Sequence, residues 1–261
     1  MASGLRHSAL IWAVLFSLPL LSKEKGILPT AYGVEENYLL LQSIDATVSN
    51  YGEEEDKLIY KRAVQHYLEF QSLFYKRRYD QAEFSAKRMQ RVLVPLYDRL
   101  IQRELKKIGT ELQLLTVAAR GNEKPQTKAF IRLTYRNLKE SESKRLTAAN
   151  SRPYLNLLKL RDYLFSLKIQ KQAGKYMVLL GLLHLNDNYP RIETTEFFTI
   201  EKMVTLHIPK DKMPEYRLRH WDNALETYEK ENCLSLYIKE PNMEDLAKPL
   251  LDIDPPYTGQ D

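Results

Sequence analysis

The chain has 261 residues, 44% of them hydrophobic and 28% charged, a balance typical of a globular protein with one large domain or two small ones. Its net charge of +5 comes from 39 basic residues interspersed with 34 acidic ones, which argues against a dedicated nucleic-acid-binding protein. The single cysteine, Cys233, excludes an intramolecular disulfide and a zinc site made of cysteines, and we expect it to be buried as a small hydrophobic side chain.

Residues 1–22 have the pattern of a secretory signal peptide. A weakly basic start precedes an apolar run over residues 9–21, which is too short to span a bilayer comfortably. Pro19 interrupts the run, and Ser22 could precede the cleavage site; an uncleaved anchor is the alternative. Because no later stretch is long and apolar enough to cross a membrane, we expect an exported protein, periplasmic or secreted, without stable membrane insertion after cleavage.

Residues 23–56 are predicted to form a flexible N-terminal segment with one short helix. Pro29 and two glycines favour a flexible start, and residues 35–48 have the apolar spacing of a short helix. The acidic run at residues 53–56 indicates the start of the next helix, because negative charge stabilises the positive end of a helix dipole.

Residues 57–119 are the stretch on which the rest of the domain is expected to pack. Their apolar residues recur three and four positions apart, as in an amphipathic helix. One helix of this length would span roughly 90 Å, so breaks are predicted near residues 76–80 and at Pro95, whose ring clashes with the preceding turn. Part of the spacing of a tetratricopeptide hairpin, which favours antiparallel helix pairs, is present at Tyr79, Ala82, Ala86 and Met89.

Gly121 and Pro125 predict a clear break before the next helix, since glycine suits a left-handed helix end. The helix that follows, residues 126–150, is highly polar, so we expect it at the periphery of the domain or against a partner.

Two helices divided by Gly174 are predicted next. The first, over residues 154–173, begins at Ser151 as its N-cap. Its apolar pattern is formed by Tyr154, Leu157, Leu158, Leu164 and Phe165. The second, over residues 176–185, is the most apolar stretch after the signal and is expected to be the buried central helix; a buried strand is the alternative.

Further helices are predicted at residues 191–208, 215–239 and 243–251. The middle one is expected to bury Trp221, Leu225, Tyr228 and Cys233. Residues 57–240 are thus predicted to form one helical domain, and residues 241–261 a short helix and tail. With only nine glycines, the chain is predicted to be all-α, an antiparallel array of about eight helices in an elongated bundle or a short solenoid-like curve.

No group of residues has the spacing of a catalytic or metal site. The histidines after the signal are not paired at metal-ligand spacing, and neither an HExxH motif, a GxSxG elbow nor a glycine-rich phosphate loop is present. Cys233 has no histidine within helical reach. We therefore predict a protein that is not an enzyme and has no catalytic residues, no cofactor and no metal site.

One surface remains as a candidate for protein binding. A basic-aromatic patch at the predicted helix junction consists of Tyr75, Lys76, Arg77, Arg78, Tyr79, Lys87, Arg88 and Arg91. Arginine binds carboxylates with two parallel hydrogen bonds, and tyrosine supplies rigid contact area. A solvated basic face without a partner is the alternative, and a membrane-surface role would need a stronger apolar face beside the cations.

The chain resembles the flagellar coiling proteins of spirochaetes. The resemblance is carried by the export signal and by residues 60–63, 67–70 and 73–77, and it covers residues 35–240 in general character. It implies an elongated helical unit that coats the periplasmic flagellar filament, contacts other sheath subunits and the filament core, and influences filament shape and motility.

The function predicted from these observations is that of a non-enzymatic exported structural or interaction protein, most plausibly in the periplasmic flagellar sheath. Two alternatives stay open. One is a tetratricopeptide-like periplasmic adaptor. The other is a carrier with an apolar pocket around residues 177–183.

Overall fold

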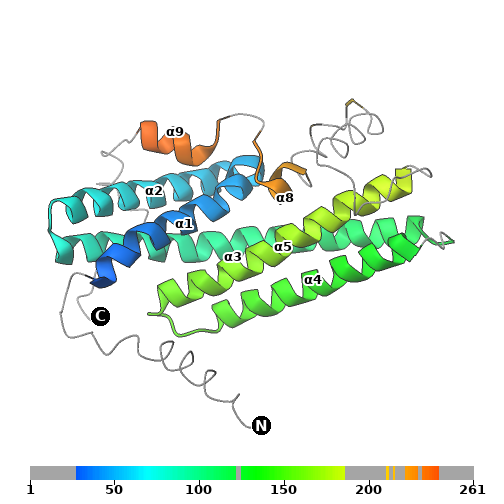
Figure 1. Cartoon of the computed structure of the whole chain (residues 1–261), viewed down its shortest axis with the longest axis horizontal. Helices are drawn as coiled ribbons and strands as arrows, with labels where there is room; N and C mark the ends of the chain where they lie inside the picture. Colours follow the sequence, from blue (N-terminus) through cyan, green and yellow to red (C-terminus); the bar gives the residue numbers. More distant parts are fainter. Residues whose placement is uncertain are drawn as a thin grey trace, which may run out of the picture.

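The protein is an elongated helical bundle (Figure 1). The computed structural model describes residues 28–121, 125–185, 210–211, 214, 221–228 and 231–240. Within these ranges it contains seven helices and no strand, which confirms the all-α prediction. The predicted signal peptide, the helices predicted at residues 191–208 and 243–251 and the predicted tail lie outside the described residues.

The first helix, α1 (Leu28–Tyr51), is longer than the short helix predicted at residues 35–48. Leu41, Ile44 and Val48 are completely buried. The spacing of these side chains places them on one face, which packs on the neighbouring helices, so α1 is part of the main core.

Helices α2 (Glu54–Tyr75) and α3 (Tyr79–Ala118) form an antiparallel hairpin. The predicted break near residues 76–80 is confirmed by the short turn between them. The predicted acidic helix start is also confirmed, because the first turn of α2 contains Glu54, Glu55 and Asp56. The Asp56 carboxylate accepts a hydrogen bond from the backbone N–H of Glu53 at 3.1 Å, so it caps the helix as well as complementing its dipole.

The predicted break at Pro95 is wrong. Pro95 lies inside α3, which continues for 40 residues. The proline is on the exposed side of the helix, while Leu93 and Leu96 beside it are completely buried. Burying leucines contributes about 1.5–3 kcal/mol each, which offsets the cost of about 3 kcal/mol for a proline inside a helix.

The predicted division at Gly174 is also wrong, because α5 (Asn156–Leu185) is one continuous helix. A Cβ atom at Gly174 would lie 3.5 Å from Cβ of Ala224 in α8 (Asn223–Leu225). The small residue therefore marks a close approach of two chain segments rather than a helix end. Ser151 is not the N-cap of α5, since its hydroxyl donates to the backbone oxygen of Thr147 at 2.9 Å.

The apolar face predicted for this helix is misplaced in part, since only Leu157 and Leu164 of the predicted set pack against the main core. Tyr154 and Phe165 are 62% exposed, and Leu158 is 46% exposed. The face that packs on the bundle is formed by Leu160, Tyr163, Ser166, Leu167 and Gln170. The polar members Ser166 and Gln170 are buried because they form hydrogen bonds to neighbouring helices, a possibility that an apolar pattern does not represent.

Substituting Gly174 by alanine is expected to raise the free energy of unfolding by about 0.5–1 kcal/mol, because glycine in a helix interior costs about that much relative to alanine. The added methyl group would make an ordinary contact with Ala224. Gly121→Ala is the matched opposite case, since Gly121 has φ of +93° and alanine is strained there. Thermal melting of both variants measures this, and a destabilised Gly174→Ala variant would contradict a continuous α5.

Helix α4 (Pro125–Ala149) lies along the lower edge of the bundle in Figure 1, against α5 and α3. Its buried face is mostly polar: Thr127, Thr134, Asn137, Ser141, Arg145 and Ala148. The hydroxyls of Ser141 and Ser166 are 2.9 Å apart, and each also donates to the other residue's backbone oxygen. The predicted polar, peripheral character is confirmed.

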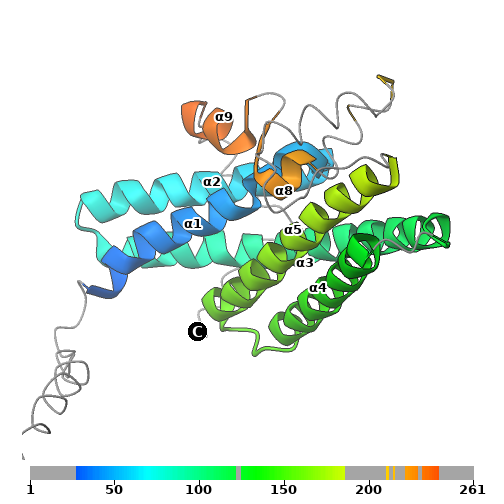
Figure 2. The same cartoon turned by 45° about the vertical axis from the view of Figure 1, so that its right-hand side comes forward.

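The single helix predicted over residues 215–239 is wrong for the residues that are described. The short α8 ends at Glu226, which adopts a left-handed conformation with φ of 59°. A separate helix, α9 (Cys233–Lys239), starts from Asn232, whose side chain accepts a hydrogen bond from the N–H of Ser235. Figures 1 and 2 show α9 lying on the side of the bundle opposite α4. As predicted, Trp221 and Cys233 are buried.

The apolar side chains form a main core and a smaller second cluster. The buried members of this second cluster, called the distal cluster, are Ile108, Leu112, Met177 and Leu180. The main core is shared by α1, α2, α3, α5 and α9, with Ala148 of α4. Met177 and Leu180, from the segment predicted to be the central helix, instead pack on Ile108 and Leu112 in the distal cluster. The most apolar stretch of the sequence is thus not the centre of the fold, because the core is assembled from one face of each of several helices.

Candidate interaction surface

The end of the α2–α3 hairpin is a tight turn, here called the hairpin tip and comprising residues 75–79. Two backbone hydrogen bonds close it, from the N–H of Arg78 to the oxygen of Leu73 and from the N–H of Arg77 to the oxygen of Phe74, both at 2.9 Å. Arg77 has φ of 57°, in the left-handed region that only a few per cent of residues other than glycine adopt. The turn therefore holds its side chains in a defined arrangement.

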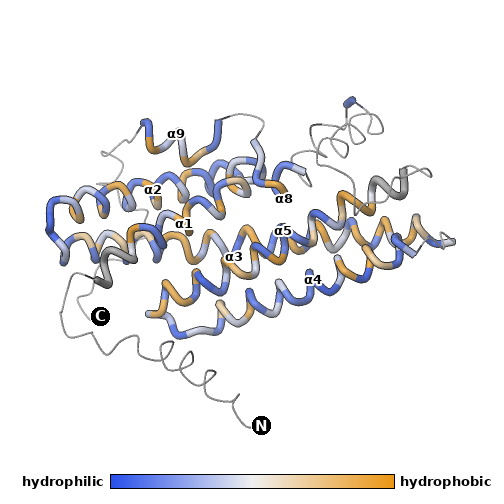
Figure 3. Tube along the Cα trace, viewed as in Figure 1, coloured by the Kyte–Doolittle hydropathy of each residue, from blue (hydrophilic) through white to orange (hydrophobic). Residues whose placement is uncertain are grey.

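Most side chains of the hairpin tip face solvent. Tyr75 is 72% exposed, and Lys76, Arg77 and Arg78 are exposed as well. Phe74 anchors the two tyrosines from below, with ring centroids 5.9 Å from Tyr75 and 5.7 Å from Tyr79. In Figure 3 this turn is the hydrophilic left-hand end of the bundle.

The three cations of the hairpin tip make no salt bridge or side-chain hydrogen bond with the described residues. Lysines on the helices contrast with them. Lys57 pairs with Glu54 at 3.0 Å, and Lys87 pairs with Glu83 at 3.3 Å. The charges of Lys76, Arg77 and Arg78 are thus available to an external anion.

The other residues predicted to belong to the patch point in different directions. Lys87 and Arg91 line a groove beside α3. Arg88 lies instead over the ring of Phe84, 5.7 Å from its centroid. The pKa of Glu69 is lowered, first by the neighbouring His66 and also by the charge of Arg88. The structure therefore groups the five tip residues together, places Lys87 and Arg91 further along α3 in the groove, and turns Arg88 onto Phe84.

The groove, called the α3–α5 groove below, has a volume of about 1110 Å³ and lies between α1, α3 and the start of α5. Its wall includes Tyr154, Leu155 and Leu158, which are exposed, and Ala86. Sequence reasoning missed it, because the apolar residues at 154–158 were assigned to a buried helix face. The feature of the sequence that could have indicated the groove is the apolar run that begins at Tyr154, directly after Pro153 and before the helix.

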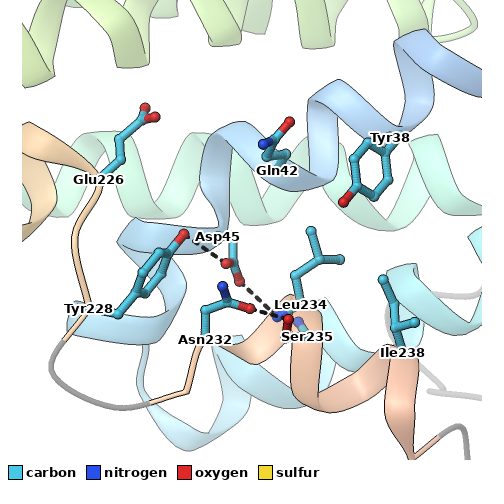
Figure 4. Close-up of a pocket in the computed structure, with 9 residues that line it drawn as sticks. All are labelled: Tyr38, Gln42, Asp45, Glu226, Tyr228, Asn232, Leu234, Ser235 and Ile238. Carbon is cyan, nitrogen blue, oxygen red and sulfur yellow. Dashed lines mark hydrogen bonds between the residues drawn. The ribbon is translucent and has the colours of Figure 1, made fainter.

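A second, smaller hollow of about 240 Å³ lies between α1 and α9 (Figure 4). Asp45 is at its base, and its carboxylate accepts hydrogen bonds from the hydroxyl of Tyr228 and from the backbone N–H of Leu234, both at 2.9 Å. Burial raises the pKa of Asp45 above its usual range, against the opposing effect of these hydrogen bonds.

These contacts fasten the start of α9 to α1. The N–H of Cys233 donates to the hydroxyl of Ser49 at 3.0 Å, and the N–H of Leu234 donates to Asp45. The first N–H groups of a helix have no partner inside the helix, so side chains from α1 supply them here. Because the Asp45 carboxylate is occupied by these donors, we interpret this hollow as a structural junction.

A buried lysine joins the same region to α5. The Nζ atom of Lys171 donates to the backbone oxygen of Ser43 and to the carboxylate of Glu226, both at 2.9 Å. Burial lowers the pKa of Lys171, although the charge of Glu226 acts in the opposite direction.

No arrangement of catalytic type is evident in the described ranges. His66 is completely buried, with Nδ1 3.7 Å from a carboxylate oxygen of Glu69, as expected of a structural histidine. The side chain of His184 and all of His207 and His220 lie outside the description. No group of three or more His, Cys, Asp or Glu positioned to hold a metal ion occurs among the described residues.

Comparison with known proteins gives one positive result. A family model described as surface protein adhesin OmpL37 matches residues 25–253. A search of curated proteins and a search of solved structures each found no match. Among the described helices, none has both the length and the apolar composition needed to cross a bilayer.

Proposed function

Because this chain belongs to the OmpL37 family of surface protein adhesins, we propose that it binds an acidic site on a protein ligand through the hairpin tip. The family supports an exported, surface-located interaction protein and is compatible with a non-enzymatic role. The choice of surface rests on the geometry of the tip.

The observation that carries this proposal is the set of three adjacent, exposed cations between two anchored tyrosines, none of them paired with a described residue. Two of the cations, Arg77 and Arg78, are arginines, whose planar groups bind carboxylates with two parallel hydrogen bonds. Exposed tyrosines add contact area at little cost in side-chain entropy, and tyrosine and arginine are enriched among the residues that dominate interface energies.

The neighbouring groove would supply the additional area that a stable complex needs. A typical interface buries about 800 Å² on each partner, which is more than a five-residue turn offers. Lys87 and Arg91 lie about two and three helical turns from the tip on the same helix and line the α3–α5 groove. A ligand that extends from the tip along α3 would therefore meet this groove and the exposed side chains of Tyr154 and Leu158.

Charge reversal at the tip tests the proposal. The double variant Arg77→Glu/Arg78→Glu is expected to bind at least about tenfold more weakly to matrix deposited by cultured cells, because charge-assisted contacts contribute about 1.5 kcal/mol or more each. Its melting temperature should stay close to that of the original chain, since exposed charges add little to stability. Binding would be measured by interferometry, and prior trypsin treatment of the matrix should abolish the tip-dependent part.

A matched control is Lys106→Glu/Arg120→Glu, which reverses two exposed charges elsewhere on the hairpin. It should bind as the original chain does. Equal losses in both double variants would show that net charge alone drives binding. Unfolding of the tip variant would show instead that the arginines hold the hairpin turn together.

The narrower role in a flagellar sheath is the second candidate. It is favoured by the elongated shape of the bundle in Figure 1, since filament coats of the kind implied by the resemblance consist of elongated helical units. Repeated lateral contacts would then add up by multivalency. Co-sedimentation with purified periplasmic flagellar filaments tests it, and near-stoichiometric recovery that the tip variant loses would favour the sheath over the matrix ligand.

A further inference from the structure

The outward face of α4 carries a line of positive charge, called the α4 cationic stripe. It consists of Lys128, Arg132, Arg136 and Lys139. Their spacing of four, four and three residues places them on one side of the helix. All four are exposed, on the side opposite the buried face of α4 that includes Thr134 and Ser141.

Within the described residues, no acidic side chain neutralises the stripe. None of its four members forms a salt bridge with a described residue, and α4 has no acidic residue before Glu140. The next acid, Glu142, is committed to Arg145, with two hydrogen bonds of 2.8 and 2.9 Å. One stripe cation contacts an aromatic ring, with Nζ of Lys139 4.8 Å from the centroid of Tyr135.

The stripe has no evident structural role but sits on a firmly packed helix. Phe130 stacks on Tyr176 of α5, with ring centroids 6.0 Å apart. The paired hydroxyls of Ser141 and Ser166 fix the helix further along. Because all four cations are exposed, removing them is expected to leave this packing in place.

The geometry is linear. With a rise of about 1.5 Å per residue, successive charges are separated by roughly 6, 6 and 4.5 Å along the axis, and the stripe is about 16 Å long. A row of cations at this spacing matches a chain of anionic groups better than it matches one compact anion. Each contact also releases condensed counterions from a polyanion, which makes binding favourable at low salt.

We propose that the α4 cationic stripe binds a linear sulfated polysaccharide. Arginine and lysine form charge-assisted hydrogen bonds with the tetrahedral sulfate groups of such a chain. Tyr135, 54% exposed, adds a flat face beside these cations. A membrane surface fits less well, because interfacial helices pair their cations with a wide apolar face. Tyr135 is the only large apolar side chain between the stripe's first and last residues that is classed as exposed.

This site is separate from the hairpin tip. In Figure 1 the tip is at the left-hand end of the bundle, whereas the first half of α4 lies toward the right-hand end of the lower edge. The inference therefore goes beyond the proposed function, and either can fail without the other.

The test uses the full chain and immobilised heparin, a heavily sulfated polysaccharide, with surface plasmon resonance at increasing salt. The variant Lys128→Gln/Arg132→Gln/Arg136→Gln/Lys139→Gln is expected to bind roughly tenfold or more weakly and to show a shallower salt dependence. The control Lys106→Gln/Arg120→Gln/Lys168→Gln/Lys175→Gln removes four exposed cations outside both proposed surfaces. It lowers the net charge by the same four units and should change heparin binding by less than about twofold. Chemically desulfated heparin should bind neither the original chain nor the two variants.

Two results would overturn the inference. Equal weakening in the stripe variant and the control would show that heparin responds to net charge only. Stripe-dependent binding to phosphatidylglycerol vesicles, with heparin binding unchanged in the stripe variant, would assign the stripe to a membrane. If the fourfold variant does not fold, the halves Lys128→Gln/Arg132→Gln and Arg136→Gln/Lys139→Gln are measured separately, and each should weaken heparin binding by an intermediate factor.

Discussion

Replacing Arg103 by methionine is expected to lower the free energy of unfolding by about 3–5 kcal/mol, because it would leave a buried carboxylate without its main partner. The side chain of Asp56 is only 1% exposed, and its Oδ2 atom lies 2.7 Å from Nη2 of Arg103. The same guanidinium also holds Glu53 at 2.7 Å and the backbone oxygen of Tyr51 at 3.2 Å. Methionine keeps the apolar stem of the side chain, so the lost stability measures the effect of removing the charged group.

The matched control is Arg99→Met. Arg99 is 37% exposed, pairs with the exposed Glu55 and approaches Asp56 only at 3.5 Å. An exposed pair contributes at most about 1 kcal/mol. Urea unfolding followed by circular dichroism would measure both variants. Similar losses in the two would mean that the buried carboxylate is not held mainly by Arg103.

The variant Leu41→Ala is expected to lower the free energy of unfolding by about 2–5 kcal/mol, the range for truncating a fully buried leucine. Leu41 is completely buried in α1, whereas Leu39, two positions earlier in the same helix, is 45% exposed. Leu39→Ala is therefore the control and should change stability by less than about 0.5 kcal/mol. Denaturant unfolding separates the two outcomes, and equal, small effects would return residues 28–51 to the flexible segment predicted from the sequence.

Local signals in the sequence were reliable where local chemistry decides the structure. The turn at residues 76–78 and the left-handed Gly121 were both predicted, and both depend on their own neighbours in the chain. Pro95 and Gly174 were misjudged, because burial on several sides stabilises a helix that propensity alone would end. Their environment comes from residues far away in the sequence.

The division between α8 and α9 was hidden for a similar reason. The start of α9 is capped by Asp45 and Ser49, more than 180 residues earlier in the chain. A helical pattern across residues 215–239 contains no sign of these partners. Long-range hydrogen bonds of this kind decide where a helix begins, and they become visible only once the fold is known.

The candidate surfaces were predicted to different extents. The sequence order of residues 75–79 was enough to predict the hairpin tip, because the five residues are contiguous. The α3–α5 groove combines three separate helices, and its exposed Tyr154 and Leu158 were taken for core residues. The α4 cationic stripe is present in the sequence spacing, but its importance depends on which face of α4 is turned outward.

The two proposed surfaces would allow one molecule to engage two components of the same matrix. Once the hairpin tip holds a protein, a polysaccharide chain near the α4 cationic stripe binds at a high effective concentration. Modest individual affinities would then give durable attachment.

The junction between α1 and α9 also affects the order in which parts of the chain fold before the protein reaches the surface. Its hydrogen bond from Leu234 to Asp45 links residues 189 positions apart, so it forms only after most of the chain has been synthesised. Contacts between such distant residues slow folding, because a long loop must close first. The attachment of α9 to α1 is therefore expected to be among the last parts of the fold to form, after the local α2–α3 hairpin.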